Sequence, residues 1–555
     1  MFIKVIEWRY NNLSGLGNDA TFFLEKDNWN DHSYLTTYAL HLSGAYTPDK
    51  QPVTIGRVKI LKLEQKEDEY NLKTGDEITT LGPEYCSLGQ SLDYYQRIAK
   101  LKEPLRTEIL TALRDIVIYP ENKVDFEEEP GFGTSLMRSI SESDDLFELG
   151  PLMVERNFYE LPSIDLKFEF TTPGLNEPFH FDFDSNKYGF NEDSLPNRII
   201  ALIGRNGSGK STLLSRISRI AFASTTDREN AVVKQIGEIK PEGIGFPRII
   251  VLSYSAFDTF QVPGIYKVEK ETIAKEMKEG LSRYVFCGIR DIIKELEDSI
   301  DKLKIDDFGR LMPEDILQDR TENTYLKSIR DLANEFCKNV RIIEELNETA
   351  MLDRVMGILS DEESLHYLAD TEFFEADDAQ NMAFFMRLST GHKFVFHAIT
   401  CIVAFTGPRS LLLFDEPETH LHPPILAVLM KAVRKVLKDR KSFMVIATHS
   451  PVVLQETLKR HVYVVRRQGE LITWNHPDIQ TFGENTGLLT STAFGLSSEV
   501  SDYHHTLDKV INALTDKIMP VLTPEQLLKE IENTFDGELS MQATAYILSK
   551  INNRQ

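Results

Sequence analysis

The sequence predicts an α/β fold with a β-rich lobe before the core and a helical insertion within it. Three observations carry this prediction. Short apolar runs that are typical of strands buried on both faces, such as 198–203 and 411–414, are each followed by a segment with helical spacing. Residues 1 to about 150 instead alternate polar and apolar side chains between turns. Residues 291–386 show mostly helical stripes.

The β-rich N-terminal lobe is assigned to residues 1–160. The run 53–63 alternates as a strand does, and turn residues separate it from its neighbours. A helical patch is expected at 107–118, and the acidic, glycine-rich stretch 126–133 is expected to form a boundary loop. Part of this lobe could join the core sheet.

The core is expected in two halves, 161–290 and 387–500, on either side of the insertion at 291–386. A helical segment at 501–555 ends the chain. The expected core elements, in chain order, are strands at 166–170, 179–183 and 198–203, a helix at 211–221, a strand at 411–414, a helix at 424–437 and a strand at 443–447.

The insertion is predicted to be compact. Heptads do not continue beyond a few turns, which argues against a long coiled-coil arm. Its two amphipathic stripes consist of Ile292, Ile293, Leu296, Ile300 and Leu303, and of Leu326, Ile329, Leu332 and Phe336.

Length, charge and cysteine content narrow the class of protein. A chain of 555 residues is too long for one core. The 62 basic and 86 acidic residues give a net charge of −24, which argues against indiscriminate coating of nucleic acid. Four scattered cysteines argue against a disulfide framework or a thiolate zinc site. Without a leader-like start or an apolar run of about 20 residues, a cytoplasmic protein with no membrane partner is expected.

The segment 204–211 reads Gly-Arg-Asn-Gly-Ser-Gly-Lys-Ser and matches G-x-x-x-x-G-K-[ST] between an apolar strand and an amphipathic helix. Backbone N–H groups and the helix N-terminus would hold phosphates in such a loop. Lys210 would bridge the β- and γ-phosphates and Ser211 would ligate Mg²⁺, so ATP and Mg²⁺ are the expected ligands. The predicted phosphate-binding residues are Gly204, Arg205, Asn206, Gly207, Ser208, Gly209, Lys210, Ser211 and Thr212.

The apolar strand 411–414 ends in Asp415 and Glu416. A strand-end acidic pair alone most often faces solvent, but a phosphate loop upstream favours a catalytic role. Asp415 is predicted to complete the Mg²⁺ shell with Ser211. Glu416, one residue further, is predicted to orient or deprotonate the attacking water.

Two further segments belong to the same pattern. Leu388-Ser-Thr-Gly-His-Lys393 precedes an apolar helix, where Ser389, Gly391 and the helix N-terminus could form a second anion cradle. Taken alone, this segment would be an ordinary helix N-cap. The strand 443–447 leads to His449, which would lie beside the γ-phosphate.

The ordered set 204–211, 388–393, 411–416 and His449 resembles the ATPase core of the ABC type. The resemblance implies that Leu388, Ser389 and Gly391 form a signature motif that acts in trans on ATP held by a second subunit. It also implies that 411–416 is the Walker B strand and that His449 is a catalytic switch histidine. Residues 415–423, Asp-Glu-Pro-Glu-Thr-His-Leu-His-Pro, are similar to the variant found in the overcoming-lysogenization-defect, RecF and related DNA-linked ATPases.

The layout most resembles the PtuA-type ATPases of Septu anti-phage systems, some of which accompany retrons. The β-rich lobe, the segment 253–258 (Ser-Tyr-Ser-Ala-Phe-Asp) after a core strand and the short helical insertion carry this likeness. It implies a homodimer or higher homo-oligomer, an HNH-type nuclease partner and a role in defence. A reverse transcriptase and retron nucleic acid are further partners that it allows.

The sequence departs from the ABC pattern at two positions. The glutamine that usually follows the core strand has no clean counterpart, and Gln261 is the nearest candidate. Lys393 replaces the acidic or glutamine residue common in signature motifs, which leaves slow hydrolysis open.

Three other constellations compete with this interpretation. His420 and His422, with Glu416 and Glu418, could hold a metal, but the prolines around them favour a turn that contacts the opposite subunit. The pair His504-His505 is similar to part of an HNH nuclease site but lacks companions, so a solvated helix start is preferred. A Toprim nuclease needs a separated Glu and an Asp-x-Asp after a strand, which do not occur beyond 450.

The sequence therefore predicts an ATPase that dimerises on ATP and regulates a nuclease partner, without nuclease activity of its own. The alternative is a self-sufficient RecF-like DNA-repair or clamp ATPase. A transporter subunit ranks third, because the N-terminal lobe is too large.

Overall fold

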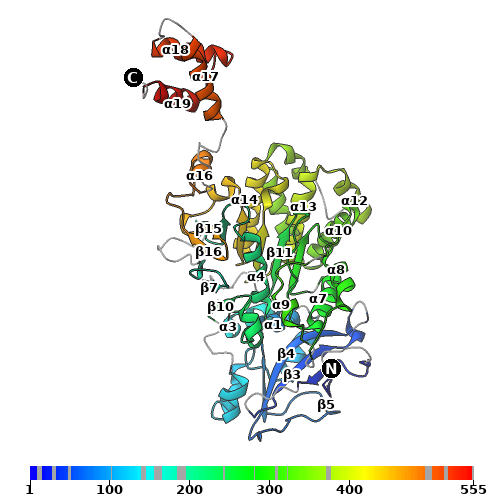
Figure 1. Ribbon diagram of the computed structural model, residues 1–555. Coiled ribbons are helices and arrows are strands. Elements are labelled where there is room, and N and C mark those ends of the chain that lie inside the picture. Colours follow the sequence, from blue (N-terminus) through cyan, green and yellow to red (C-terminus); the bar gives the residue numbers. More distant parts are fainter. Residues whose placement is uncertain are drawn as a thin grey trace. The chain divides into compact units, whose positions relative to one another are not determined.

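Figure 1 shows the computed structural model of the chain. The chain forms two compact units, Met1–Gly483 and Glu484–Gln555. The boundaries expected at 160/161 and 500/501 lie outside the described residues. The structure describes residues 1–8, 16–27, 33–47, 50, 52–99, 101, 103–138, 145–155, 166–183, 195–241, 244–280, 282–306, 310–321, 323–370, 377–493, 503–517 and 523–552.

The strands of the N-terminal lobe form a six-stranded sheet in the order β5-β1-β2-β3-β4-β6. β1 is parallel to β2, and the other pairs are antiparallel. The alternating run 53–63 is the long strand β4. The bounds are β1 (Ile3–Ile6), β2 (Phe22–Lys26), β3 (Thr37–Leu42), β4 (Val53–Lys62), β5 (Glu77–Ile78) and β6 (Tyr85–Gly89).

Helices α1 (Leu92–Ala99), α2 (Leu105–Ala112) and α3 (Asp145–Glu155) follow this sheet. The helix expected at 107–118 was predicted too long. Arg114 takes φ 53°, which breaks the helical backbone. Asp115 then accepts hydrogen bonds from Val117 N (2.9 Å) and Ile118 N (3.1 Å) and forms a turn.

The core sheet has seven strands in the order β12-β11-β13-β14-β9-β15-β16. All are parallel except β16, which pairs antiparallel with β15. The first five in this order are buried over their whole length, as continuous apolar runs predict. The bounds are β9 (Ile199–Ile203), β11 (Ile249–Ser253), β12 (Tyr284–Gly288), β13 (Leu411–Asp415), β14 (Phe443–Thr448), β15 (Val462–Gln468) and β16 (Leu471–Asn475).

The core helices follow their strands as predicted, and the α/β fold class is confirmed. α4 (Lys210–Phe222) packs against β11, β13 and β14. α13 (Thr390–Phe405) and α14 (Pro423–Asp439) precede and follow β13. Because parallel strands end at one edge of a sheet, the loops after β9, β11, β13 and β14 come together there. The remaining elements before the insertion are a small antiparallel sheet of β7 (Lys167–Thr171), β8 (Phe179–Asp182) and β10 (Glu238–Lys240), and the helices α5 (Thr225–Arg228), α6 (Ala231–Lys234) and α7 (Lys267–Glu279).

The insertion is helical and joins the core through α10. Phe336 of α10 stacks on Phe385 of α12 (ring centroids 5.1 Å apart) and meets Phe396 of α13 edge to face. Half of the second expected stripe is wrong, because Leu326 lies before the helix and both Leu326 and Ile329 are exposed. The bounds are α8 (Ile292–Ile300), α9 (Pro313–Leu317), α10 (Ile329–Glu345), α11 (Thr349–Leu359), η5 (Glu363–Asp370) and α12 (Asp378–Arg387).

The unit Glu484–Gln555 contains α16 (Thr486–Ala493), α17 (Tyr503–Lys517), α18 (Pro524–Thr534) and α19 (Met541–Asn552). Apolar residues of α17, α18 and α19, among them Ile511, Ile531 and Ile547, form a core of their own. His504 stacks flat on Tyr546, with ring centroids 3.9 Å apart. Across both units, none of the described helices has the length and apolar character needed to cross a bilayer.

Candidate nucleotide-binding site

The loop after β9 has the backbone that a phosphate-binding loop needs. Gly204 takes φ 156°, and a Cβ there would lie 2.3 Å from Val465 O of β15, so only glycine fits. Gly209 takes φ 94° and forms the N-cap of α4, which begins at Lys210. The helix N-terminus therefore follows directly on the loop, an arrangement that favours anions.

Lys210 is almost fully buried at the base of this loop. Its Nζ donates to Gly204 O (3.0 Å) and lies 2.9 Å from His449 Nε2, which follows β14. Burial lowers the pKa of Lys210, while the carboxylates of Glu416 and Asp415 act in the opposite direction. Lys210 and His449 are therefore in contact. The first was predicted from the loop and the second from a strand far along the chain.

Ser211 and Asp415 also meet. The Ser211 hydroxyl donates to Asp415 Oδ1 at 3.1 Å. Burial raises the pKa of Asp415 to about 8; the Ser211 hydrogen bond opposes that shift, and the charges of Asp258 and Glu416 add to it. A hydroxyl and a carboxylate next to a phosphate loop are oxygen donors of the kind that Mg²⁺ prefers. The residues present therefore fit this ion.

Glu416 lies beside His449. Its Oε1 is 3.5 Å from His449 Nε2, and the neighbouring His449 lowers the pKa of Glu416, helped by the charge of Lys210. Glu416 takes φ 45°, a left-handed backbone that is rare outside glycine and clusters at functional sites. The carboxylate is therefore ionised and held at the same point as Lys210.

Glu418 has a role that the sequence pattern did not predict. It was expected to contact a second subunit, but its carboxylate accepts hydrogen bonds within the chain. Oε2 accepts from Thr448 Oγ1 (2.9 Å) and Oε1 accepts from His449 N. Glu418 thus fixes the loop that presents His449. The sequence contains a pattern that could have indicated this role: Glu418 lies two positions beyond Glu416, in the turn that begins at Pro417.

The metal site considered for His420 and His422 is not supported. Within the residues that the structure describes, no group of three or more His, Cys, Asp or Glu side chains could hold a metal ion. His420 instead meets the ring of Phe394 edge to face, and His422 is the N-cap of α14.

The segment 388–393 begins α13. Ser389 is the N-cap and accepts from His392 N at 3.3 Å, and Lys393 Nζ donates to Leu388 O. A Cβ at Gly391 would lie 3.0 Å from His420 O, so α13 packs closely on the turn after β13. Ser389 and Thr390 are exposed. The segment is therefore joined to the Asp415–Glu416 strand end and presents its first turn outward.

Gln261, the nearest candidate for the missing glutamine, does not face this site. Its Nε2 donates to Arg320 O (3.2 Å) and to Gln318 Oε1 (3.4 Å), both in the insertion.

Replacing Glu418 with alanine is expected to lower the free energy of unfolding by about 2 kcal/mol, because the buried Thr448 hydroxyl and His449 N–H lose their acceptor. Urea denaturation measures this change. Thr419→Ala in the same turn removes one exposed hydrogen bond, from the Thr419 hydroxyl to Glu416 O, and serves as the control with the smaller expected loss. Equal losses in the two variants would contradict the assignment.

Comparison with known proteins finds a family model that is similar to part of the chain. The family model described as "AAA domain, putative AbiEii toxin, Type IV TA system" matches residues 288–455, which include Asp415, Glu416 and His449. Among solved structures, the SMC head domain from Thermotoga maritima (TM-score 0.25, 14% identity) is covered over 98% of its length by 56% of this chain. The SMC head bound to the C-winged helix domain of ScpA (TM-score 0.27, 13% identity) is covered over 97% by 57% of this chain.

One curated protein matches along almost the whole chain. Protein ea59 of Escherichia phage lambda is 30% identical over an alignment of 553 residues, which covers 96% of this chain and 95% of the relative. The chain therefore belongs to the protein ea59 family and contains an AAA-family P-loop ATPase domain.

Proposed function

We propose that this protein binds ATP with Mg²⁺ and hydrolyses it in a closed homodimer. One observation carries the proposal: Lys210 and Glu416 both meet His449 where Ser211 and Asp415 pair, at the C-terminal edge of a parallel sheet. These side chains come from three strand ends that are far apart in sequence. Phosphoryl transfer needs positioned charge of this kind rather than covalent chemistry.

Each side chain has a distinct task in this proposal. Backbone N–H groups of the loop and Lys210 hold the phosphates, and Ser211 with Asp415 hold the metal ion. Mg²⁺ would supply charge neutralisation at the transferring phosphate. Glu416, ionised and partly exposed, accepts a proton from the attacking water.

His449 connects phosphate binding to Glu416. An ammonium only donates hydrogen bonds, so His449 Nε2 accepts from Lys210 in this structure. When Lys210 turns to a phosphate, the imidazole can adopt the tautomer that carries its proton on Nε2, and this N–H then donates to the carboxylate of Glu416, which is 3.5 Å away. Binding of ATP thereby orders the base.

Equilibrium binding of a fluorescent ATP analogue tests the first step. Saturable binding that tightens with Mg²⁺ and is displaced by unlabelled ATP is expected. Absence of binding at any Mg²⁺ concentration would contradict the proposal.

The dimer is proposed because the turn at Ser389 faces outward and begins a helix, so it can meet the phosphates of a second subunit. Ser389→Glu is expected to leave ATP binding unchanged and to weaken the ATP-dependent dimer about 10-fold or more, because its carboxylate would face a phosphate. Light scattering with ATP measures the mass in a Glu416→Gln background, which retains ATP.

Ser328→Glu is the control, since Ser328 caps α10 in the insertion and its hydroxyl likewise accepts from the N–H three residues further on. It is expected to dimerise normally. A Ser389→Glu protein that dimerises as tightly as the parent would contradict the trans role. Gly391 is a poorer choice, because any side chain there meets His420 O within the same chain.

We further propose that the ATP-bound dimer regulates a separate HNH-type nuclease in anti-phage defence. The support is the motif resemblance to PtuA-type ATPases of Septu systems, some of which carry a retron. Co-purification of the tagged protein expressed from its native operon tests this role. Recovery of an HNH-type subunit is expected, whereas recovery of DNA with no second polypeptide would favour the RecF-like alternative.

A further inference from the structure

Asp258 is a buried carboxylate that the proposed mechanism has not used. It lies five positions beyond Ser253, where β11 ends, and is 6% exposed. Its Oδ1 accepts from Phe260 N (2.8 Å) and is 3.4 Å from Arg290 Nη1. Its Oδ2 is buried with no hydrogen-bond partner in the part of the chain that the structure describes. An ionised oxygen in this position is costly unless a cation meets it.

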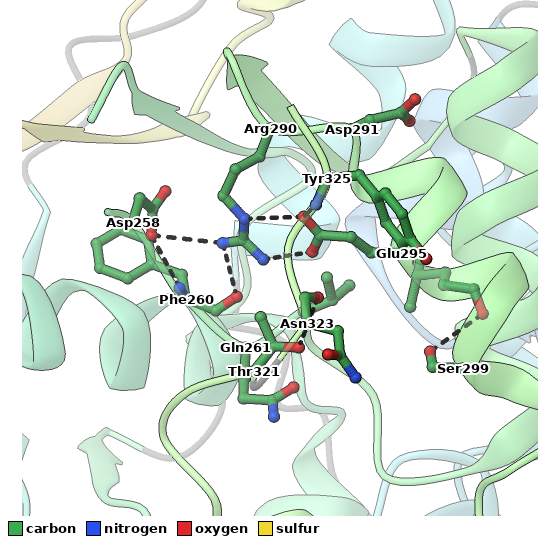
Figure 2. A network of polar contacts seen from close by, with 12 residues as sticks. Asp258, Phe260, Gln261, Arg290, Asp291, Glu295, Ser299, Thr321, Asn323 and Tyr325 are labelled. Carbon is green, nitrogen blue, oxygen red and sulfur yellow. Dashed lines mark hydrogen bonds and ion pairs between the residues drawn. The ribbon is translucent and has the colours of Figure 1, made fainter. Parts of the chain in front are cut away.

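Arg290 does not supply that cation fully. Figure 2 shows its guanidinium between Asp258 and Glu295, with Asp291 directed away. Nε and Nη2 both bond to the carboxylate of Glu295, the Nε distance being 3.1 Å, and Nη1 donates to Phe260 O at 3.1 Å. Arg290 is fully buried. One guanidinium thus serves two buried carboxylates, and its short contacts go to Glu295.

Asp258 follows a strand that ends at the same edge of the core sheet as the strand before the phosphate loop. Ser253 pairs in register with Asp415 on the neighbouring strand, and Asp258 is close enough to Asp415 for their charges to interact. Asp415 in turn accepts from the Ser211 hydroxyl. The Ser253 hydroxyl is also buried there, and its interaction with the Asp258 carboxylate lowers the pKa of Asp258, against the larger upward shift from burial. This edge therefore gathers oxygen atoms with an excess of negative charge, which a divalent cation would balance.

We propose that Asp258 is a positioning residue that completes the cation environment beside Ser211 and Asp415 and, through Arg290 and Glu295, transmits occupation of that environment to the helical insertion. This inference rests on the proposed function, because the cation in question is the one that accompanies ATP.

A chain of hydrogen bonds connects Asp258 to the insertion beyond Arg290. Glu295 is on α8, and its Oε1 also accepts from Tyr325 N at 3.1 Å. Asp291, at the N-cap of α8, bonds through its N–H to Tyr325 O at 2.8 Å. The segment at Tyr325 leads into α10, which packs on α13, and Ser389 is the N-cap of α13. A movement of Asp258 toward a cation would change its contact with Arg290. Because Arg290 is bonded to Glu295, that change would reach α8.

Asp258→Asn is the test, because asparagine keeps the acceptor for Phe260 N and Arg290 and removes the charge. The Mg²⁺ concentration that gives half-maximal tightening of ATP-analogue binding is expected to rise about 10-fold or more. Binding of the analogue in EDTA should not change. Without ligand, the melting temperature should stay the same or rise, because an uncompensated buried charge is gone.

Asp291→Asn is the control: it neutralises a carboxylate next to Arg290 whose hydrogen bond caps α8. In this control, the Mg²⁺ concentration that gives half-maximal tightening of analogue binding should equal that of the wild type. The link to the insertion is read by hydrogen exchange of α8 and of the segment at Tyr325 when Mg²⁺ and ATP are added. The wild type should gain protection there. Asp258→Asn should not, and Glu295→Gln should lose that response while keeping the Mg²⁺ affinity.

The outcomes distinguish failure of this inference from failure of the proposed function. If ATP binds and Asp258→Asn titrates Mg²⁺ like the wild type, the inference is wrong and the proposed function stands. If the wild type binds no nucleotide in either EDTA or Mg²⁺, the proposed function is wrong and the inference falls with it. A melting temperature that drops in Asp258→Asn with unchanged Mg²⁺ dependence would assign Asp258 a purely structural role and overturn the inference.

Discussion

Replacing Lys210 with alanine is expected to weaken ATP binding about 100-fold or more, which is a loss of about 2.7 kcal/mol. Lys210 is the side-chain cation at the base of the phosphate loop, and its Nζ already lies against Gly204 O and His449 Nε2. Charge-assisted contacts to phosphate in a poorly solvated loop are among the stronger polar interactions. Titration with a fluorescent ATP analogue in Mg²⁺ measures the effect.

Lys210 is buried, so the variant needs a control for folding. Lys270→Ala removes another buried lysine, one that donates to Val262 O away from the phosphate loop. It should bind the analogue with wild-type affinity, although it too loses stability. Wild-type affinity in Lys210→Ala, with both variants folded by circular dichroism, would show that the loop does not bind the phosphates.

Replacing Glu416 with glutamine is expected to keep ATP binding and to reduce hydrolysis about 100-fold or more, the scale of a lost general base. Glutamine has the same shape and can keep the contact with His449, but it accepts no proton from water. Lys210, Ser211 and Asp415 remain in place. Phosphate release under single-turnover conditions, with analogue binding measured in parallel, checks both halves of this expectation.

Glu456→Gln is the control for the same chemical change, because Glu456 pairs with Arg434 and lies outside the site. Its hydrolysis rate should equal that of the wild type. If Glu416→Gln hydrolyses ATP as fast as Glu456→Gln, then Glu416 is not the base and another group activates the water.

Much of the site could be predicted because its chemistry sits at strand ends. Apolar runs identify buried strands, and parallel strands bring their C-terminal ends to one edge. The loop at 204–211, the carboxylates after 411–414 and the histidine after 443–447 were therefore predicted to lie together. The structure brings Lys210 to His449 and Ser211 to Asp415 by that route.

Other parts of the site depend on contacts that no local pattern encodes. Asp258 and Arg290 are 32 positions apart and stand in segments whose charges look like ordinary surface charges. Their pairing follows from the parallel pairing of β12 with β11, which sets Gly288 beside Ser253. The acceptor role of Glu418 within the chain was missed for the same reason, since it depends on where β14 ends. The over-long helix at 107–118 shows that one left-handed residue, Arg114, can end a segment with helical spacing.

The rate of phosphate release per subunit, measured with Mg²⁺ and ATP across a range of wild-type protein concentrations, tests the central claim most directly. Light scattering on the same samples gives the fraction of dimer. If ATP is hydrolysed at a site that two subunits complete, the rate per subunit should rise in parallel with the dimer fraction. A rate that is zero throughout, or that stays constant while the dimer forms, would contradict the account.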